Sequence, residues 1–263
     1  MLGASSVAAP RVRVDLKGAV ATLTLDRPRA RNPIDENMAS QLRDACSGLS
    51  SDNSVRVVVL TGAGDVFYAG VEFAGRYRSG TPTKTLPQSF TVAEHIAAIP
   101  KPVVAAINGD AMDQGLELAM ACDLRIASEH ARMGLTQLAH GTMPRDGGTQ
   151  RLPRLVGRAR ALEMLLTARV VNASDALRIG LVNEVAAEGR AVELSHELAA
   201  AIAGLAPIAT RYLKEAVLKG LDMPLDQGLR LEADLSILLH STADRAEGLR
   251  SFVERRPAAF RGK

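Results

Sequence analysis

The segment 101–128 has an order of strand, turn and helix signals that constrains the fold more than any other part of the chain. An apolar, β-rich stretch ends at Asn108, the following turn carries Gly109 and Gly115, and a helix begins around Gln114. The N-terminus of a helix presents backbone N–H groups that lack intrahelical partners, together with the positive end of the helix dipole. We therefore expect a rigid strand–turn–helix unit at which an oxyanion can be held.

A carboxylate lies within the first turn of this expected helix, at Glu117. A hydrogen-bond donor and a proton-transfer group on one rigid element suit reactions that pass through an enolate or a tetrahedral intermediate. The spacing alone also allows a Glu117 that only complements the helix dipole, since acidic residues are common in first turns. Both interpretations stay open on these residues alone.

A second glycine-bearing turn follows the apolar strand of the segment 55–73, which reads VRVVVLTGAGDVFYAGVEF. Two such turns can deliver two backbone N–H groups to one point. The segment lacks the third glycine of a dinucleotide-binding loop, and no Gly-Lys-Ser/Thr follows as in a phosphate-binding P-loop. These two nucleotide-binding patterns are therefore excluded for this turn.

The composition is that of one globular domain, or of one domain with an appendage. Of the 263 residues, 47% are hydrophobic and 23% are charged, so the chain is able to bury a large core. Aromatic residues make up 3% and tryptophan is absent, which argues against a protein that stacks on nucleic-acid bases. The net charge of +3 is not gathered into a basic patch, and it is compatible with an anionic cofactor.

The two cysteines, Cys46 and Cys122, are isolated in the sequence, as are the histidines. No metal-ligand spacing appears, so we expect reduced core cysteines and no metal. The N-terminal residues have no charged region followed by a long apolar stretch, and no run approaches about 18 apolar residues. We expect a soluble cytoplasmic protein without a membrane or nucleic-acid partner.

Apolar periodicity predicts a recurring order of strand, strand and helix, followed by a wholly helical region after about Leu194. The expected strands are 20–26, 55–61, 102–108 and 124–127, and the expected helices are 36–49 and 92–99. The helical region has an apolar stripe that comprises Leu225, Leu229, Leu235, Leu238 and Leu239. This stripe is more apolar than the exposed face of a surface helix usually is. It favours burial against a neighbouring subunit, with packing on its own domain as the alternative.

Several motifs together resemble the crotonase superfamily, the enoyl-CoA hydratase/isomerase family. GAGDVFYAG is similar to its first oxyanion loop, and KPVVAAINGDAMDQGLELAMACDLRIAS is similar to its second. HGTMPRDGGTQRLPRLVGRARALEMLLTARVVNASDALRIGLVNEV matches the segment that follows, and TADRAEGLRSFVERRPAAF matches the closing helix. The resemblance extends from about Val12 to Phe260, which is nearly the whole chain.

This resemblance implies an α/β fold, a crotonase-like spiral of ββα repeats over residues 1–193. Residues 194–263 would form a C-terminal helical region for trimers, paired into hexamers, and for contact with CoA. The implied activity is hydration or dehydration of an α,β-unsaturated acyl-CoA thioester, with an acyl-CoA thioester as the binding partner. No separate cofactor is implied, because coenzyme A is part of the substrate.

The implied catalytic carboxylate is Glu117, and the implied oxyanion-hole donors are the backbone N–H groups of Val71 and Gln114. Two such donors stabilise a developing oxyanion by roughly 3 kcal/mol each. Gln114 stands where the family usually has glycine, so a positive φ there would add strain on the order of 1 kcal/mol.

The chain departs from the family at Gln137, where the two-glutamate hydratases have the second carboxylate. An amide holds water or a carbonyl group by hydrogen bonds, but it does not exchange a proton at a useful pKa. Glu117 then does both proton transfers, or the substrate needs only one, or ordinary hydratase activity is lost. The alternatives are an isomerase, lyase or thioester hydrolase with one carboxylate, a weakly catalytic CoA-thioester binding protein, or a Gln137 that is only a polar pocket residue.

The resemblance also implies contacts with CoA and the substrate. The matching positions are Arg29, Ala30, Arg31, Ala69, Glu72, Phe73, Phe252 and Arg255. Arginines suit the phosphates of CoA, although each one alone reads as a solvated surface charge. Three further residues are candidates for the pocket wall, namely Tyr68, Asp113 and His140. His140 is a candidate acid or base because of its near-neutral pKa, with a hydrogen-bonded structural role as the alternative.

Overall fold

The computed structural model describes residues 10–69 and 91–263, and its main sheet has six strands in the order β1-β2-β3-β4-β6-β9. The first pair is antiparallel and the remaining neighbours are parallel. The strands are β1 (Val12–Lys17), β2 (Val20–Leu25), β3 (Val57–Gly62), β4 (Val103–Ile107), β6 (Leu124–Ser128) and β9 (Glu184–Ala186). β3 and β4 are buried along their whole length, as expected for parallel strands covered on both faces.

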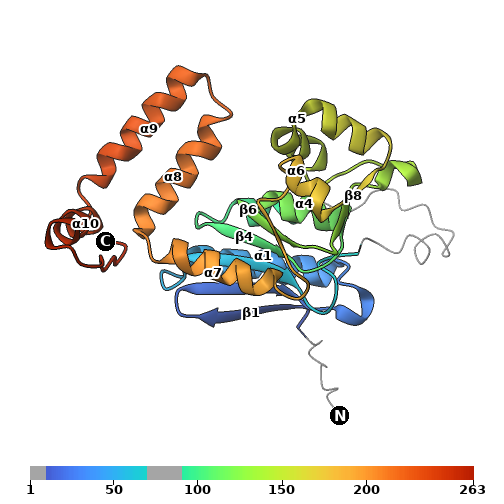
Figure 1. Ribbon diagram of the computed structural model, residues 1–263, viewed down its shortest axis with the longest axis horizontal. Helices are drawn as coiled ribbons and strands as arrows, with labels where there is room; N and C mark the ends of the chain where they lie inside the picture. The colour runs from blue at the N-terminus through green and yellow to red at the C-terminus, as the bar shows by residue number, and fades with distance from the viewer. Residues whose placement is uncertain (1–9, 70–90) are drawn as a thin grey trace, which may run out of the picture.

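Each face of this sheet has its own hydrophobic core, because successive side chains of a strand point to opposite faces. Val58 and Leu60 of β3 belong to the larger core, which includes α1 (Glu36–Ser51) and α3 (Ala93–Ala97). Val57 and Val59 belong to the smaller core, beneath α7 (Ala191–Ala203). Figure 1 shows α7 lying across the sheet.

A smaller sheet, in the order β5-β7-β8, lies next to the helices that follow β4. Its strands are β5 (Ala111–Met112), β7 (Arg132–Gly134) and β8 (Val170–Asn172). The helices packed against it are α4 (Gln114–Ala121) and α6 (Ala173–Arg178), and α5 (Gly148–Leu166) packs on α4. Two 3-10 turns also occur, η1 (Pro28–Ala30) after β2 and η3 (Gln137–His140) after β7. α5 is kinked at Gly157, whose φ of 77° is not helical.

The mixed α/β class and the strands and helices expected from periodicity are confirmed, with shifts of a few residues at their ends. The sequence patterns missed β1, β9 and the short strands of the smaller sheet. The boundary expected after residue 193 falls inside α7, whose buried face packs on the main sheet. The helices that stand apart from the sheet begin with α8.

Three C-terminal helices project from one end of the main sheet, as Figure 1 shows. They are α8 (Pro207–Gly220), α9 (Leu225–Leu239) and α10 (Ala243–Glu254). Of the expected apolar stripe, only Leu235 is buried in the single chain, whereas Leu225 is 77% and Leu229 is 56% exposed. The alternative in which the stripe packs on its own domain is therefore not favoured.

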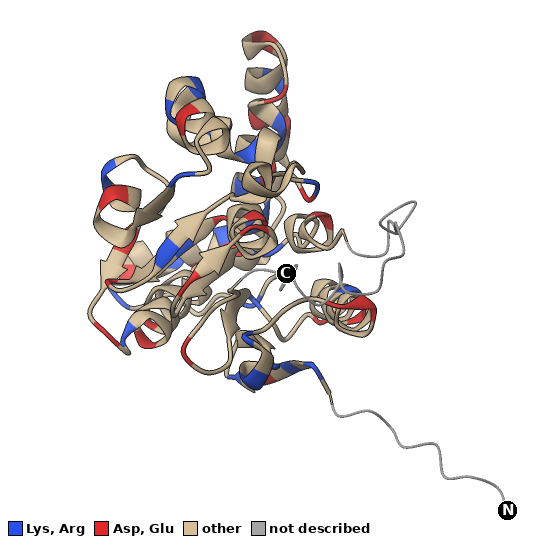
Figure 2. Ribbon diagram, turned by 90° about the vertical axis from the view of Figure 1, so that its right-hand side faces the viewer, with Lys and Arg blue, Asp and Glu red and all other residues tan. Residues whose placement is uncertain are grey.

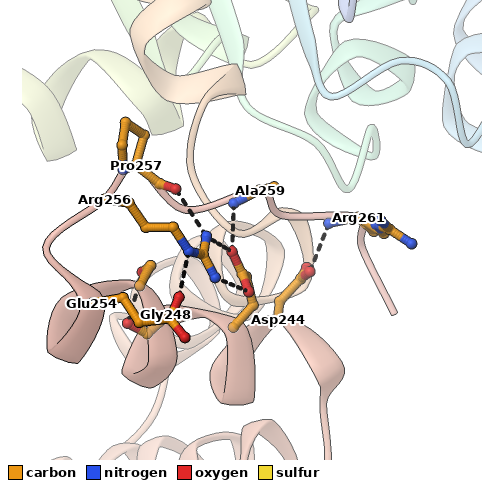
Figure 3. Close-up of polar contacts among 9 residues, drawn as sticks. Asp244, Gly248, Glu254, Arg256, Pro257, Ala259 and Arg261 are labelled. Atoms are coloured by element: carbon orange, nitrogen blue, oxygen red, sulfur yellow. Dashed lines mark hydrogen bonds and ion pairs between the residues drawn. The ribbon is translucent and has the colours of Figure 1, made fainter.

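The C-terminal tail folds back onto α10, as Figure 3 shows. The carboxylate of Asp244 accepts hydrogen bonds from the backbone N–H groups of Arg261 and Gly262, at 2.6 and 2.7 Å. Glu247 binds Arg256 through both of its oxygens and also accepts a bond from the N–H of residue 259. The tail is thereby fixed to the last helix.

Two basic side chains connect the projecting helices to the core. Arg56, just before β3, donates to the carbonyl oxygens of Ala203 and Phe260, at 2.9 and 2.7 Å. Lys214 of α8 forms an ion pair with Asp123, with its Nζ 2.7 Å from the carboxylate. In Figure 2, basic and acidic residues are interspersed along the helices and strands, in keeping with the small net charge.

No single helix among the described residues is long and apolar enough to cross a membrane. The pair α7 and α8 passes such a test together by length and composition only, with a bend of 108° between the two helices.

Candidate active site

Glu117 lies in the first turn of α4, as the sequence predicts, and its side chain is turned into the protein. The residue is only 2% exposed. Its Oε1 atom accepts hydrogen bonds from the backbone N–H groups of Asp146 and Gly148, each at 2.8 Å. Asp146 lies just before α5, and Gly148 is the first residue of this helix. The start of a second helix therefore fixes Oε1 of Glu117, and Oε2 remains for other contacts.

The pKa of Glu117 is raised from an ordinary 4.5 to about 7. Burial is the main cause, because it penalises the charged carboxylate. The two backbone N–H bonds lower the pKa, while the negative charges of Asp146 and Asp113 raise it. No ion pair with a described residue neutralises Glu117, so the carboxyl group is poised to take up and release a proton near neutral pH.

Gln137 is the side chain that faces the second oxygen of Glu117. It is 8% exposed, and its Nε2 donates to Glu117 Oε2 at 3.4 Å. Its Oε1 is buried and has no hydrogen-bond partner among the described residues. A buried acceptor of this kind is costly unless a ligand or a water molecule satisfies it. His140, three residues further along η3, is exposed instead.

Glycine is required where the backbone approaches Glu117 and the start of α4. A Cβ atom on Gly148 would lie 3.0 Å from Glu117 Oε1 and 2.7 Å from the Cβ of Pro144. A Cβ atom on Gly115 would lie 2.4 Å from the Cβ of Tyr68. The start of α5 therefore approaches Glu117 as closely as the backbone allows. The loop at Tyr68 approaches the start of α4 equally closely.

The strained residue at the start of α4 is Asp113, not Gln114. Asp113 has φ 52° and ψ −118°, a conformation that favours glycine, whereas Gln114 is not among the residues with positive φ. The Asp113 carboxylate accepts bonds from the N–H and the hydroxyl of Thr136, at 2.7 and 3.0 Å. Asp113 therefore joins α4 to the turn that carries Gln137.

Gln114 is the first residue of α4, so its backbone N–H lies in the first turn of the helix, where N–H groups have no intrahelical acceptor. Its side chain donates from Nε2 to Asp146 Oδ2 at 3.0 Å. The side chain is thus used to fix the helix start, and the backbone remains the candidate oxyanion donor.

The first glycine-bearing loop runs beside the approach to α4. Tyr68 is fully buried, its N–H donates to the carbonyl of Asp110 at 2.9 Å, and its carbonyl accepts from Met112 N–H at 2.8 Å. The N–H of Ala69 donates to the carbonyl of Arg31 at 3.2 Å. Three predicted site residues of this loop, Val71, Glu72 and Phe73, lie outside the described residues.

The predicted CoA loop is held against these turns by Asn32, which is fully buried. Its Nδ2 donates to the carbonyls of residues 63 and 66, at 2.9 and 3.0 Å, and its Oδ1 accepts from the N–H of residue 27 at 2.9 Å. Arg29, Ala30 and Arg31 are exposed on the outside of the same loop. The loop thus presents two arginines at the surface beside the first glycine-bearing loop, with the Arg31 guanidinium 3.7 Å from the Asp110 carboxylate.

Phe252 and Arg255 are not brought to Glu117 within one chain. Phe252, on α10, is 83% exposed, and Arg255 is the left-handed residue that ends this helix. In Figure 1, α10 lies at the opposite side of the molecule from α4 and α5. A contact of these residues with the Glu117 site would have to come from another chain.

Sequence reasoning missed the residues that hold the predicted ones in place. The main examples are Asn32, Thr136, Asp146 and Gly148. A signal existed for two of them, because an Asp-Gly-Gly sequence at a helix start is typical of a turn whose backbone N–H groups point at an acceptor. Among residues 10–69 and 91–263 no group of three or more His, Cys, Asp or Glu side chains has the geometry of a metal site. The absence of a metal and of a separate cofactor stays a prediction.

The fold and this site define a class of α/β enzymes with a buried glutamate beside a helix start, and comparisons with known proteins identify the class. The enoyl-CoA hydratase/isomerase family model matches residues 15–263. An (E)-benzylidenesuccinyl-CoA hydratase from Thauera aromatica is 38% identical over 257 residues, which cover 95% of this chain and 99% of that protein. The crotonyl-CoA hydratase of Syntrophomonas wolfei is 37% identical over 249 residues, which cover 93% and 95%.

A solved structure of an enoyl-CoA hydratase from Bacillus anthracis matches with a TM-score of 0.92 and 36% sequence identity. The match covers 97% of this chain and all of that chain. The chain belongs to the enoyl-CoA hydratase/isomerase family, within the crotonase superfamily.

Proposed function

We propose that the protein hydrates an α,β-unsaturated acyl-CoA thioester, and catalyses the reverse dehydration, with Glu117 as the acid and base. The observation that carries the proposal is the state of the Glu117 side chain. One oxygen is fixed by two backbone N–H groups, the other faces a buried amide, and the pKa is about 7. A carboxyl group with a pKa near the working pH is well suited to take a proton and return it.

In the forward reaction, Glu117 takes a proton from water as the water oxygen bonds to the β-carbon of the substrate. The electron pair of the double bond moves to the thioester carbonyl, where the backbone N–H of Gln114 stabilises the enolate oxygen. Val71, outside the described residues, is the proposed second donor. Glu117 then delivers its proton to the α-carbon, so one water molecule is added and the enzyme returns to its starting state.

We assign Gln137 the role of holding the water, in the position where the family's two-glutamate hydratases have a second carboxylate. Its unsatisfied, buried Oε1 accepts a bond from a water that also donates to Glu117 Oε2. The amide orients the nucleophile and leaves both proton transfers to Glu117. Names of relatives such as crotonyl-CoA hydratase support hydration over the isomerase, lyase and hydrolase alternatives.

The binding of CoA and the assembly of subunits follow from the exposed surfaces. Arg29 and Arg31 would bind the phosphates of CoA. The exposed leucines of α9 would be buried in a trimer, or in a hexamer of paired trimers. Phe252 and Arg255 would then reach CoA in a neighbouring subunit. A trimeric or hexameric mass by light scattering is expected, and a monomer at micromolar concentration would contradict the assembly.

The test of the proposed reaction is a screen of CoA thioesters by mass spectrometry. We expect an enoyl-CoA substrate to gain 18 mass units, the mass of one water, with loss of the product in a Glu117→Gln variant. An isomer of unchanged mass, or free CoA, would instead support one of the single-carboxylate alternatives. Gln137→Glu sharpens the result, because it restores a second carboxylate and is expected to change the rate of crotonyl-CoA hydration.

A further inference from the structure

We propose that Asp146 is a positioning residue of the active site, which holds the proton-transfer carboxylate and the oxyanion helix in one arrangement. Asp146 lies in the short segment between η3 and α5, and it does not need to touch the substrate for this role. The inference rests on the proposed function, because it concerns the same site. It assigns a role to a residue that the catalytic scheme does not use.

The carboxylate of Asp146 is buried, with an exposure of 7%, and both of its oxygens are bonded. Oδ1 accepts from the backbone N–H groups of Val92 and Ala93, at 3.2 and 3.0 Å. Oδ2 accepts from Val92 N–H and from the side-chain Nε2 of Gln114, each at 3.0 Å. All of these donors are neutral, so the negative charge of Asp146 is stabilised by hydrogen bonds rather than by an ion pair.

These bonds join the starts of two helices. Ala93 is the first residue of α3, and Gln114 is the first residue of α4, whose backbone is the candidate oxyanion donor. A carboxylate at two helix starts is favoured by both helix dipoles. If the Asp146 carboxylate is removed, both helix starts lose their shared anchor.

The backbone of Asp146 completes the connection to Glu117. Its N–H donates to Glu117 Oε1 at 2.8 Å, and its carbonyl oxygen accepts from the Arg151 guanidinium at 2.9 Å. The residue whose N–H orients Glu117 is therefore held by α5 through its own carbonyl oxygen, in the next peptide unit, and its side chain is held by α3 and α4. A displacement of this residue would move Glu117 and Gln114 together.

Asp146 also acts on Glu117 through its charge. Burial raises the pKa of Glu117 most, and the backbone N–H bonds from Gly148 and Asp146 lower it; the carboxylate of Asp146 is the larger of the two negative charges that raise it further, the other being Asp113. The other charged or titratable groups on the helices packed against α4 are, on α3, Glu94 and His95, whose side chains are 69% and 32% exposed, and, on α5, Arg151, Arg154, Arg158, Arg160 and Glu163. His140 on η3 is exposed. Asp146 therefore makes two separable contributions to the site. Its hydrogen bonds hold Glu117 and Gln114 in place, and its charge raises the pKa of Glu117.

Two substitutions separate these contributions. Asp146→Asn removes the charge but keeps an oxygen for Val92 and Ala93, while its amide nitrogen faces the Gln114 amide, which can turn its oxygen towards it. Asp146→Ala removes both the charge and the anchor. A control is Asp123→Asn at the opposite end of α4, where a partly buried carboxylate accepts the backbone N–H of Val103 at 2.7 Å and also pairs with Lys214.

The experiment combines steady-state kinetics with a titration of the Glu117 carboxyl carbon by ¹³C NMR, assigned by its loss in Glu117→Gln. Asp146→Asn is expected to lower the Glu117 midpoint below about 7, and to shift the acidic limb of the kcat/KM profile the same way. Asp146→Ala is expected to lower kcat by about 100-fold, with little change in KM. Asp123→Asn is expected to leave the Glu117 midpoint unchanged.

The positioning role is overturned if Asp146→Ala loses activity only in proportion to its unfolded fraction, as a purely structural residue would. The electrostatic contribution is overturned if Asp146→Asn leaves the Glu117 midpoint and the pH profile at their wild-type values. If Asp146→Ala does not fold, Gln114→Ala removes the side-chain bond to Asp146 Oδ2 and keeps the backbone N–H of residue 114, and an unchanged kcat in this variant overturns the positioning role. A failure of the proposed hydration would appear as a wild-type protein that converts no enoyl-CoA, while the NMR midpoints would still report on Asp146.

Discussion

Two glutamates in this chain accept similar hydrogen bonds and yet have opposite electrostatic environments. Glu117, in the site, binds two backbone N–H groups, and its pKa is raised to about 7. Glu247, on α10, binds one backbone N–H and the guanidinium of Arg256, and its pKa is lowered to about 2. Figure 3 shows Arg256 directed at the last helix, with the tail folded back over it.

The difference comes from burial and from the counter-ion. Glu117 is nearly inaccessible to water and has no cationic partner among the described residues, so its charged form is penalised. Glu247 is partly exposed and has an arginine within 2.6 Å, so its charged form is favoured. Backbone N–H bonds alone therefore do not fix the charge of a carboxylate, and a raised pKa at Glu117 marks a site organised for proton transfer rather than for stability.

The largest expected effect in this comparison is on catalysis. Glu117→Gln keeps the shape and the hydrogen-bond acceptor but removes the proton-transfer group, so kcat is expected to fall by about 10²- to 10⁴-fold. The affinity for CoA is expected to stay nearly unchanged, because the arginine loop is untouched. Glu247→Gln is the control and is expected to retain full turnover. Full turnover by Glu117→Gln would leave Glu117 as a helix-dipole residue.

The next effect is on stability. Glu117→Gln is expected to raise the free energy of unfolding at high pH, although it lowers kcat. Because the folded-state pKa of Glu117 is above its ordinary value of 4.5, wild-type stability is lost as the pH rises from about 4.5 through about 7. Glu117→Gln is free of this penalty and is expected to be more stable than the wild type at pH 8, by on the order of 3 kcal/mol. Urea unfolding at several pH values measures the difference. An unchanged or lower stability at pH 8 would contradict the raised pKa.

A smaller effect is expected from crowding Glu117 without removing it. In Gly148→Ala, the new Cβ would lie 3.0 Å from Glu117 Oε1 and would push the carboxylate from its place. We expect kcat to fall by about tenfold, with KM nearly unchanged, since small misplacements of catalytic groups are costly. The matched control is Gly48→Ala, in the interior of α1, where a Cβ would meet nothing within 4 Å. This control is expected to keep kcat and to gain about 0.5–1 kcal/mol of stability.

The smallest effect is expected at the C-terminal ion pair. Because the pKa of Glu247 is below its ordinary value, its contribution to stability is present above about 4.5 and is lost as the pH falls towards about 2. Glu247→Gln should therefore reduce stability slightly at pH 7, and less at pH 4 or in high salt, since exposed ion pairs are weak and screened. A loss of stability that is independent of both pH and salt would argue against an electrostatic role.

The sequence predicted the elements of the site better than the contacts between them. The strand before Asn108 and the helix with Glu117 were predictable, because a buried apolar run, a glycine-bearing turn and an acidic first turn are local signals. The smaller sheet was not, because strands of two or three residues have no measurable period.

The partners of the predicted residues were harder to find because they depend on distant segments. Asp146 is 29 residues from Glu117 in the chain, and Thr136 is 23 residues from Asp113. The position of the strain shows the same limit. The sequence indicated that Gln114 would be strained if φ were positive, whereas the fold places the positive φ on Asp113, whose carboxylate is anchored to Thr136.

The most direct measurement is a ¹³C NMR titration of the carboxyl carbons of Glu117 and Glu247 in the wild-type protein, with each signal assigned by its Gln variant. A midpoint of about 7 is expected for Glu117 and one of about 2 for Glu247. Two midpoints near the ordinary value of 4.5 would contradict a Glu117 that burial has prepared for proton transfer at neutral pH.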